Sequence, residues 1–441
     1  MHLSKVIILT LNITFAIVKN KQAITLLFIA NIISGFAQGI SMVAIPWYFV
    51  KVVNRPEVFA TAYLVITFLT LFWGLYAGTL IDRYSRKNIF ILVNVICGVF
   101  IGSVAIYGLQ IAYLPDILVL LVFGITIFNY NVHYPNLYAF GQEITEKRNY
   151  GKLNSYIEVQ GQVTSVLAGA FAAILLTGTV GNSLEIGGFG FTLPFNIEPW
   201  KIYEVFLMDA FTYLLVIIFF LFMKYKAIAK DEIHTGNLLS RLTQGVAYLK
   251  ENPIIFVFGI ASYMLFAFTL VEVHVLLPSY VFNFLKMDGN IYASAEIYYS
   301  FGAILSGVLI LRIFKKINTV VGIILLMILV AFAFYAMSMY KILWIFFLGN
   351  FILGITNAGV RILRTTYLFN HVPNNLIGRT NSVFNSLNIM IRMLLIGIFA
   401  LPFFQINDNI RFGYLIGVLV IALTLIPLAI WYKRIISAER N

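Results

Sequence analysis

The sequence predicts an all-α integral membrane protein whose twelve transmembrane helices form two six-helix bundles related by pseudo-symmetry. The 441 residues are 61% hydrophobic and only 11% charged, whereas a soluble globular chain carries about 25% charged residues. Apolar runs of about 20 residues, the length that crosses a bilayer, recur along the whole chain. Short basic loops separate these runs. One short pattern of glycine, basic, asparagine and serine residues occurs once in each half of the chain.

Six apolar runs lie before a polar segment, and six lie after it. We therefore expect an N-terminal bundle at 1–224, a cytoplasmic linker at 225–252 and a C-terminal bundle at 253–441. The predicted spans are 22–50, 57–81, 88–108, 116–140, 153–178, 201–224, 254–282, 291–311, 317–339, 342–369, 380–404 and 411–433.

Three segments outside the spans have a distinct character. Val6–Val18 is apolar, but it is short for a span and no signal-peptide cleavage site follows it, so we expect an interfacial segment. Leu238–Lys250 has its apolar residues at helical spacing and predicts an amphipathic helix at the membrane surface, which Asn252-Pro253 ends. The Gly, Pro and Asn residues of 178–200 indicate turns, and whether this loop forms a hairpin or a lid stays open.

The basic residues predict the orientation in the membrane. Most of the 30 Lys and Arg residues lie in or next to the loops and tails on one side. Basic residues favour the cytoplasmic side, so both termini are predicted to be cytoplasmic. The basic residues outside this pattern are Lys51, Arg55, Lys201, Lys286, Lys341, Arg411 and, within a span, Arg392.

Charge and cysteine content exclude other classes of protein. The net charge of +12 is spread over short loops instead of forming a basic face with reachable aromatic residues, so we expect no nucleic-acid partner. The single cysteine, Cys97, lies in an apolar run and allows neither a disulfide framework nor a thiolate metal site. We expect no metal and no cofactor.

A charged loop follows the second span. Gly78 is followed by Asp82, Arg83, Arg86 and Lys87, and four charges within six residues cannot lie in hydrocarbon. Gly78 would let a neighbouring helix approach closely, and Asp82 is the only acid among the cations.

An internal repeat connects the two halves. Gly151-Lys152-Leu153-Asn154-Ser155 matches Gly378-Arg379-Thr380-Asn381-Ser382. At nearly the same offset, Gly307–Lys316 is a degenerate copy of the charged loop, with Leu311 in the place of Asp82. Repeats of this kind predict two parallel halves related by an axis along the membrane normal.

These features together resemble the major facilitator superfamily over essentially the whole chain. The segments 207–213 and 245–253 resemble its bacterial macrolide-efflux and enterobactin-exporter-like branch. The resemblance implies alternating access, with Asp82 and the neighbouring cations bonding to a helix end of the other half to close the inner side. Proton-coupled drug antiporters of the family carry an Arg in the fourth span and a Pro in the fifth-span motif. This chain has no such Arg and only Ser165–Gly169 in place of the motif, which weakens that expectation.

Polar residues form stripes at helical spacing in four spans, which predicts groups that face an aqueous cavity. In the resembled family these four spans, the first, fourth, seventh and tenth, line the substrate cavity. Bonds between helices would explain each polar residue equally well. The candidate cavity residues are Asn31, Ser34, Gln38, Asn129, His133, Asn136, Thr269, Glu272, Asn357 and Arg361.

Charged and titratable groups inside spans are candidates for function. A desolvated Glu272 could carry a proton, unless it reaches interfacial water, and His133 could carry a proton or make a structural bond. Arg361 could neutralise an anionic substrate, and Arg364 is expected to anchor at headgroups. Glu158 and Arg392 are charges without an assigned partner, and Asp209 is expected to be structural.

The sequence therefore predicts a secondary active transporter, expected to be a monomer in a bacterial cytoplasmic membrane. The leading hypothesis is proton-coupled export of an amphipathic small molecule such as a drug, macrolide or siderophore. An importer of a sugar or organic acid and a lipid or lysophospholipid flippase or scaffold are the alternatives. An enzyme is not expected, because the chain has no His-Glu-x-x-His, Gly-x-Ser-x-Gly or phosphate-loop motif.

Overall fold

The computed structural model of the protein describes residues 20–146, 149–179, 182–225, 238–314 and 318–440. Within these residues, twelve helical segments are long and apolar enough to cross a membrane. This confirms the predicted all-α class and the twelve spans. The apolar segment Val6–Val18 lies outside the described residues, and the orientation of the termini stays a prediction.

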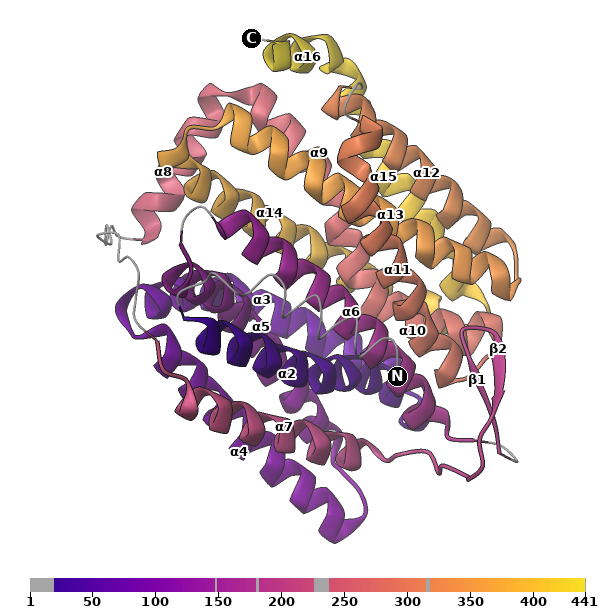
Figure 1. Ribbon diagram of the computed structural model, residues 1–441. Coiled ribbons are helices and arrows are strands. Elements are labelled where there is room, and N and C mark those ends of the chain that lie inside the picture. The colour runs from indigo at the N-terminus through magenta and orange to yellow at the C-terminus, as the bar shows by residue number, and fades with distance from the viewer. Residues whose placement is uncertain (1–19, 147–148, 180–181, 226–237, 315–317, 441) are drawn as a thin grey trace. The chain divides into compact units, whose positions relative to one another are not determined.

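Six spans precede the linker (Figure 1). Pro56 opens the second of them, where the missing proline N–H leaves no helical hydrogen bond unmade. The first continues into a π-helical segment, Tyr48–Val52. The six helices are α2 (Lys21–Trp47), α3 (Pro56–Arg83), α4 (Arg86–Ile111), α5 (Asp116–Ile144), α6 (Tyr150–Thr177) and α7 (Ile202–Phe222).

The linker contains a helix, and six further spans follow it (Figure 1). Asp288 and Asn318 cap two of these helices, because their side chains accept hydrogen bonds from the backbone N–H groups of Gly289 and Val320. The helices are α8 (Leu238–Glu251), α9 (Pro253–Val271), α10 (Leu277–Ser279), α11 (Gly289–Ile313), α12 (Thr319–Met339), α13 (Leu343–His371), α14 (Asn374–Phe399), α15 (Phe412–Ile430) and α16 (Tyr432–Arg440).

The seventh span is one continuous helical rod, Pro253–Leu285, that twice changes its winding. A π-helical segment, Glu272–Leu276, follows α9, and a second one, Tyr280–Leu285, follows α10. Pro278 lies between them and cannot donate a backbone hydrogen bond. Short π-helical segments within α-helices occur often at functional sites.

The loop between α6 and α7 contains a β-hairpin of β1 (Ser183–Ile186) and β2 (Phe189–Thr192). Ile186 is paired with Phe189, so only Gly187 and Gly188 form the turn. Both glycines have positive φ angles, +62° and +79°, the backbone that a tight two-residue hairpin turn requires. The turn-rich loop 178–200 therefore contains a hairpin at 183–192.

The chain divides into two compact units that differ from the predicted domains. Unit 1 comprises the described part of Met1–Gln38, Trp73–Thr164 and Tyr203–Thr235. Unit 2 comprises Gly39–Phe72, Ser165–Ile202 and the described part of Gly236–Asn441. One end of α2, α3 and α6 thus groups with the C-terminal spans. The boundaries 1–224, 225–252 and 253–441 stay a prediction about the two halves.

Unit 1 has an aromatic core between its helices. Phe90 of α4 stacks on Phe220 of α7, with ring centroids 4.6 Å apart, and also contacts Phe140 of α5. All three rings are at most 2% exposed. Burying side chains of this size is the main source of packing energy between helices.

Unit 2 joins residues that are far apart in the sequence. Trp47 at the end of α2 stacks on Tyr292 of α11, with ring centroids 5.4 Å apart. On α8, a side chain at Gly245 would lie 2.6 Å from the backbone oxygen of Arg379. The glycine therefore lets α8 pack directly against α14. The predicted helix in the linker is present, and its place at the membrane surface stays a prediction.

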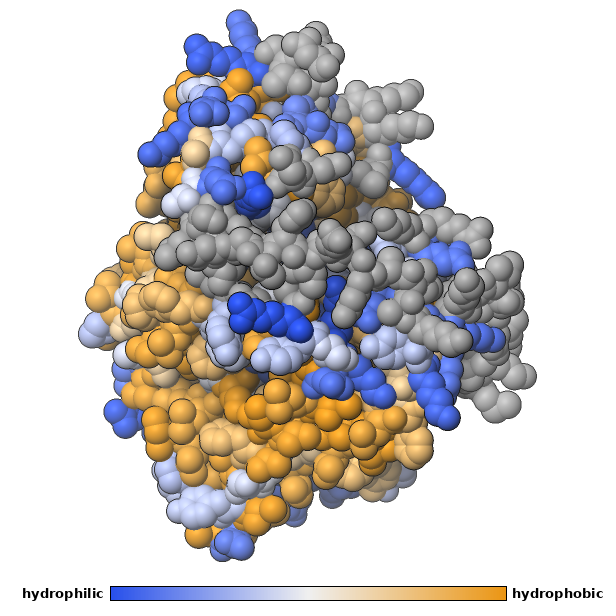
Figure 2. Space-filling model, turned by 90° about the vertical axis from the view of Figure 1, so that its left-hand side faces the viewer, coloured by the Kyte–Doolittle hydropathy of each residue, from blue (hydrophilic) through white to orange (hydrophobic). Residues whose placement is uncertain are grey.

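Large apolar side chains cover much of the surface, as expected for helices that face lipid. Figure 2 shows one face on which hydrophobic residues form a broad continuous area, with hydrophilic residues gathered above it and at its margins. Among the most exposed are Phe72, Val99, Phe222, Phe332 and Ile430, each more than 60% exposed. Exposing an apolar surface of this kind to water is unfavourable.

Candidate functional site

Two of the predicted cavity stripes meet in unit 1. The ring nitrogen Nε2 of His133 on α5 lies 2.8 Å from Oδ1 of Asn31 on α2. One turn further along α2, Nε2 of Gln38 donates to Oγ of Ser34 at 2.7 Å, and both side chains are 2% exposed. The fold thus joins the polar faces of the first and fourth spans by a bond between helices, and their place in a substrate cavity stays a prediction.

The other polar residues of α5 bond to neighbours within unit 1. Nδ2 of Asn129 donates to the hydroxyl of Tyr213 on α7 at 3.3 Å. Nδ2 of Asn136 donates to the backbone oxygen of Arg86 at 2.9 Å, and Asn136 has no exposed surface. Bonds of this kind fix one helix against another in a membrane. A role of these two residues in substrate binding stays a proposal.

The charged loop after α3 makes its observed bonds within unit 1. Nη1 of Arg86 lies 2.9 Å from Oε2 of Glu143 near the end of α5, and Nζ of Lys87 donates to the backbone oxygen of Met223. Arg83 is exposed, and the side chain of Asp82 lies outside the described ones. In this structure Arg86 and Lys87 therefore bond within the N-terminal half, and the bond to the other half stays a proposal.

Gly78 does not mark a close helix contact in this structure. A Cβ atom built at Gly78 would meet no atom of the described residues within 4 Å, and Gly78 itself is exposed. The expectation that this glycine lets a neighbouring helix approach is therefore wrong for the described residues. Spacing in the motif could not show this, since it does not tell which way the residue faces.

Glu272 opens the first π-helical segment of the seventh span and has no exposed surface. Its Oε1 accepts a hydrogen bond of 2.8 Å from the hydroxyl of Tyr414 on α15. Among the described residues, no basic group lies within ion-pair distance of this carboxylate. The carboxyl group does not reach interfacial water, which excludes that explanation of its position.

A second acid, Glu296 on α11, belongs to the same polar region. The hydroxyls of Ser165 on α6 and Ser300 on α11 bond to its carboxylate, the latter at 3.4 Å. Glu296 and Glu272 interact electrostatically. Glu296 is not among the residues predicted from spacing, because the eighth span has no regular polar stripe. A lone acid within a span was the signal that could have identified it.

The remaining cavity candidates of unit 2 differ in their surroundings. Nδ2 of Asn357 on α13 donates to the hydroxyl of Tyr299 on α11 at 2.7 Å. Thr269 donates to the backbone oxygen of Leu265 one turn before it in α9, and Arg361 is exposed. Asn357 therefore connects α13 to the region around Glu296, whereas the bond of Thr269 stays within its own helix.

Arg364 does not anchor at headgroups as expected. It is only 5% exposed, its Nη1 donates to the backbone oxygen of Ser262 at 3.0 Å, and its guanidinium lies 3.6 Å from the ring centre of Tyr263. A cation on an aromatic face with a carbonyl partner is satisfied inside the protein. The expectation failed because its position near a helix end was taken to imply contact with the interface.

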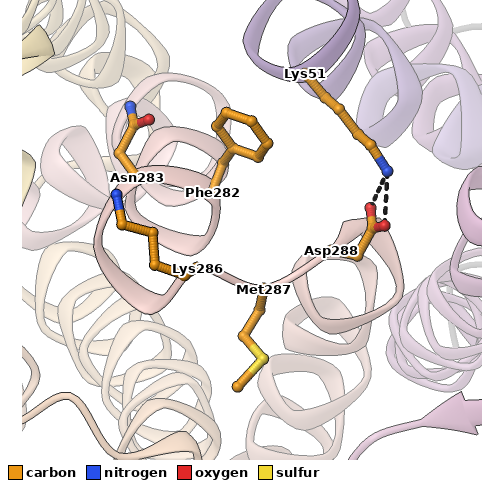
Figure 3. Close-up of a pocket in the computed structure, with 6 residues that line it drawn as sticks. All are labelled: Lys51, Phe282, Asn283, Lys286, Met287 and Asp288. Atoms are coloured by element: carbon orange, nitrogen blue, oxygen red, sulfur yellow. Dashed lines mark hydrogen bonds and ion pairs between the residues drawn. The ribbon is translucent and has the colours of Figure 1, made fainter.

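A cavity of about 400 Å³ lies where the seventh and eighth spans meet (Figure 3). On one side of it, Nζ of Lys51 contacts both carboxylate oxygens of Asp288, at 2.5 and 2.6 Å. Asp288 is also the N-cap of α11. Figure 3 shows Asn283 and Lys286 on the other side of the cavity from this ion pair. The ion pair thus joins the π-helical end of the first span to the start of α11.

Two other charges of the spans have partners in unit 1. The hydroxyl of Tyr138 donates to Oε1 of Glu158 at 2.8 Å. Asp209 on α7 has no exposed surface and interacts electrostatically with Cys97 and Tyr213. In the described residues, no group of three or more His, Cys, Asp or Glu side chains could hold a metal ion.

Comparison with known proteins gives the family. Residues 27–389 match the family model of the Major Facilitator Superfamily. A mutant of the nucleoside transporter NupG is similar in structure, with a TM-score of 0.68 and 14% identity over 91% of this chain and 99% of that chain. A bacterial homologue of the iron transporter ferroportin gives a TM-score of 0.66 and 14% identity over 93% of this chain and 98% of that one.

A D-xylose–proton symporter gives a TM-score of 0.63 and 13% identity over 93% of this chain and 97% of that one. No curated protein sequence matches the chain. At these identities the similar structures show the fold alone, and the family model covers most of the chain. The chain therefore belongs to the Major Facilitator Superfamily and is a secondary transporter.

Proposed function

We propose that this protein exports an amphipathic small molecule, such as a drug, macrolide or siderophore, across a bacterial cytoplasmic membrane in exchange for protons. Membership of the superfamily supports alternating access by two halves, with both termini in the cytoplasm. In this mechanism, Asp82, Arg83, Arg86 and Lys87 help to close the inner side.

The buried carboxyl group of Glu272 carries the proposal of proton coupling. A charge withdrawn from water needs either a counter-charge or a proton, because burying an unpaired ion costs several kcal/mol. The partner of Glu272 is the neutral hydroxyl of Tyr414. Glu272 also lies in a π-helical segment, where the backbone can rewind when the span moves.

The surroundings of Glu272 support an amphipathic substrate. Tyr280 lies 4.8 Å from Tyr414 between ring centroids, and Tyr63 of α3 lies 5.6 Å from the ring of His274. Aromatic rings with a polar end accept both apolar and hydrogen-bonding parts of a ligand. Few fixed polar groups among many aromatic ones are typical of small-molecule sites.

The test measures proton-linked transport by the full-length protein in proteoliposomes. With an imposed pH gradient, the wild type should transport ethidium or erythromycin against a concentration gradient. Glu272→Gln should abolish the response to the pH gradient, because the amide cannot take up a proton. Glu57→Gln is the matched control, since Glu57 is 46% exposed at the start of α3 and should leave transport unchanged. An unchanged pH response in Glu272→Gln would exclude Glu272 as the proton carrier.

Uptake of a nutrient is the second candidate function. The similar structures include a nucleoside transporter and a D-xylose–proton symporter, which share the fold. Cells that lack the protein separate the two directions. An importer predicts lost uptake of labelled nucleosides or sugars, whereas an exporter predicts higher accumulation of erythromycin or ethidium.

A further inference from the structure

Arg392 is a charged residue in the middle of α14, the eleventh span. Asn381, Asn385, Asn388 and Arg392 are spaced four, three and four residues apart, so they lie on one face of the helix. An arginine inside a span is costly unless it meets a polar partner or a water-filled space. The polar stripe of α14 therefore ends at a cation that is unfavourable within the span unless it meets a polar group, an anion or water.

The groups around Arg392 come from two other spans of unit 2. The hydroxyl of Tyr63 on α3 bonds to its guanidinium. His274, in the π-helical segment of the seventh span, interacts with it electrostatically. The rings of Tyr63 and His274 meet edge to face, with centroids 5.6 Å apart. Arg392 and His274 can thus both donate hydrogen bonds at one place, whereas the hydroxyl of Tyr63 donates to the backbone oxygen of Leu270 at 3.5 Å and accepts from the guanidinium.

Arg392 has no acidic partner among the residues that the structure describes. Within the described residues, no Asp or Glu forms an ion pair with Arg392, and its buried Nε has no hydrogen-bond partner. Glu272 and Glu296 interact with each other, and Glu272 accepts its hydrogen bond from Tyr414. Arg392 as a whole residue is only partly buried, although its Nε is fully buried.

We propose that Arg392, with Tyr63 and His274, binds an anionic oxygen group, a carboxylate or a phosphate, of the transported molecule. The guanidinium offers a planar fork of donors that matches both groups, the imidazole of His274 adds a single donor, and the hydroxyl of Tyr63 holds the guanidinium in place. The rings of Tyr63 and His274 face the apolar part next to the anionic group. The proposal rests on the transport function above and assigns its substrate to amphipathic anions.

The test is binding to the purified full-length protein in nanodiscs of phosphatidylcholine, with no pH gradient. The probes are 2-naphthoate, its neutral match 2-naphthamide, phenyl phosphate and inorganic phosphate, at up to millimolar concentration. We expect 2-naphthoate and phenyl phosphate to raise the melting temperature of the wild type saturably, and 2-naphthamide to leave it unchanged. Arg392→Gln should weaken binding of 2-naphthoate at least about tenfold, because a charge-assisted bond is lost.

Two further variants separate binding from folding. Arg392→Lys keeps the charge without the fork, and it should bind 2-naphthoate with an affinity between those of the wild type and Arg392→Gln. Arg379→Gln makes the same change near the start of α14 and should bind like the wild type. Equal responses to naphthoate and naphthamide, no response to any anion, or full binding by a folded Arg392→Gln would each overturn the proposal.

The source of the anion is resolved by adding phosphatidylglycerol to the nanodiscs. Competition with 2-naphthoate in the wild type and not in Arg392→Gln would identify a lipid headgroup as an occupant of the site. Without competition, the site takes a free solute. Because the assay contains no proton gradient, loss of proton coupling in the transport test leaves this result unaffected, and the two proposals fail independently.

Discussion

The ion pair between Arg86 and Glu143 shows how a single residue can connect the charged loop to the rest of unit 1. Glu143 is only 7% exposed and Arg86 is 24% exposed. Asn136 also bonds to the backbone of Arg86, so the residue is held at two points. A charge left unpaired at this depth destabilises more than an exposed one, because less water can solvate it.

We predict that Glu143→Gln lowers the free energy of unfolding by about 2 kcal/mol, less than the loss of a fully buried pair because Arg86 is partly solvated. Arg86→Gln in the same background should cost little more, since the pair is already broken. Melting temperatures of the four proteins of this double-mutant cycle check the coupling. Additive losses would show that the two side chains do not stabilise each other.

For single residues, the sequence predicted which side chains share a helix face but not which partners those side chains meet. The spacing predicted that Asn31 and His133 each lie on the polar face of a helix, but it could not predict the bond between them, which joins residues 102 positions apart. The partner of Glu272 could not be predicted, because Tyr414 is 142 residues away in a span with almost no other polar group. Spacing along a helix shows which side chains share a face, and only the packing shows what that face meets.

At the scale of elements, the β1–β2 hairpin is fixed to α11 by its turn. The backbone N–H of Gly187 donates to Oγ of Ser294, and the hydroxyl of Tyr298 donates to the backbone oxygen of Gly187, both at 2.8 Å. Nδ2 of Asn290 donates to the backbone oxygen of Glu185. Two short strands alone are marginally stable, so these bonds hold the hairpin in place.

We predict that Ser294→Ala loosens the hairpin without unfolding the protein. It leaves the buried N–H of Gly187 without a partner, which costs about 1–3 kcal/mol. Hydrogen exchange over 183–192 should become faster by about tenfold or more, since each 1.4 kcal/mol is about a factor of ten. Ser306→Ala, also buried on α11, is the control and should leave the hairpin unchanged. Equal exchange in both variants would contradict the assigned bond.

The elements themselves were predictable to different degrees. Helical spans follow from the length of apolar runs, because every backbone group must be satisfied within lipid. The sequence could not distinguish a hairpin from a lid. The pair Gly187 and Gly188 looks like part of any glycine-rich loop unless the flanking strands are known to pair. The π-helical segments of the seventh span leave no mark in hydropathy, since a single extra residue in a turn does not alter composition.

On the scale of the whole molecule, the twelve spans and the family were within reach of the sequence, whereas the compact units were not. Hydropathy and the repeat of Gly151–Ser155 in Gly378–Ser382 indicate two equivalent halves. The assignment of Gly39–Phe72 and Ser165–Ile202 to the unit of the C-terminal spans depends on contacts such as Lys51 with Asp288. The hydrophobic periodicity of a segment does not show which distant segment it contacts.

We predict that the β1–β2 hairpin faces the outside and the charged loop faces the cytoplasm, as the distribution of basic residues implies. Glu185→Cys should react with a membrane-impermeant maleimide in intact cells, and Tyr84→Cys should react only after permeabilisation. Both positions are exposed, and the native Cys97 is buried and gives little background. The opposite labelling pattern would place the hairpin in the cytoplasm and the charged loop outside, and would contradict the predicted orientation.

The π-helical segment at Glu272–Leu276 also has a consequence for the geometry of the seventh span. One extra residue in a helical turn shifts the phase of everything after it by about 100° relative to an uninterrupted α-helix. Tyr280 and Phe284 therefore point where an α-helix would direct their sequence neighbours. Deletion of one residue after Glu272 in this segment would remove the extra residue and keep Tyr280 facing Tyr414, the tyrosine that also bonds to Glu272. The same deletion in the α-helical part before it, Pro253–Val271, would turn Tyr280 away by about 100° and reshape the site while preserving the span.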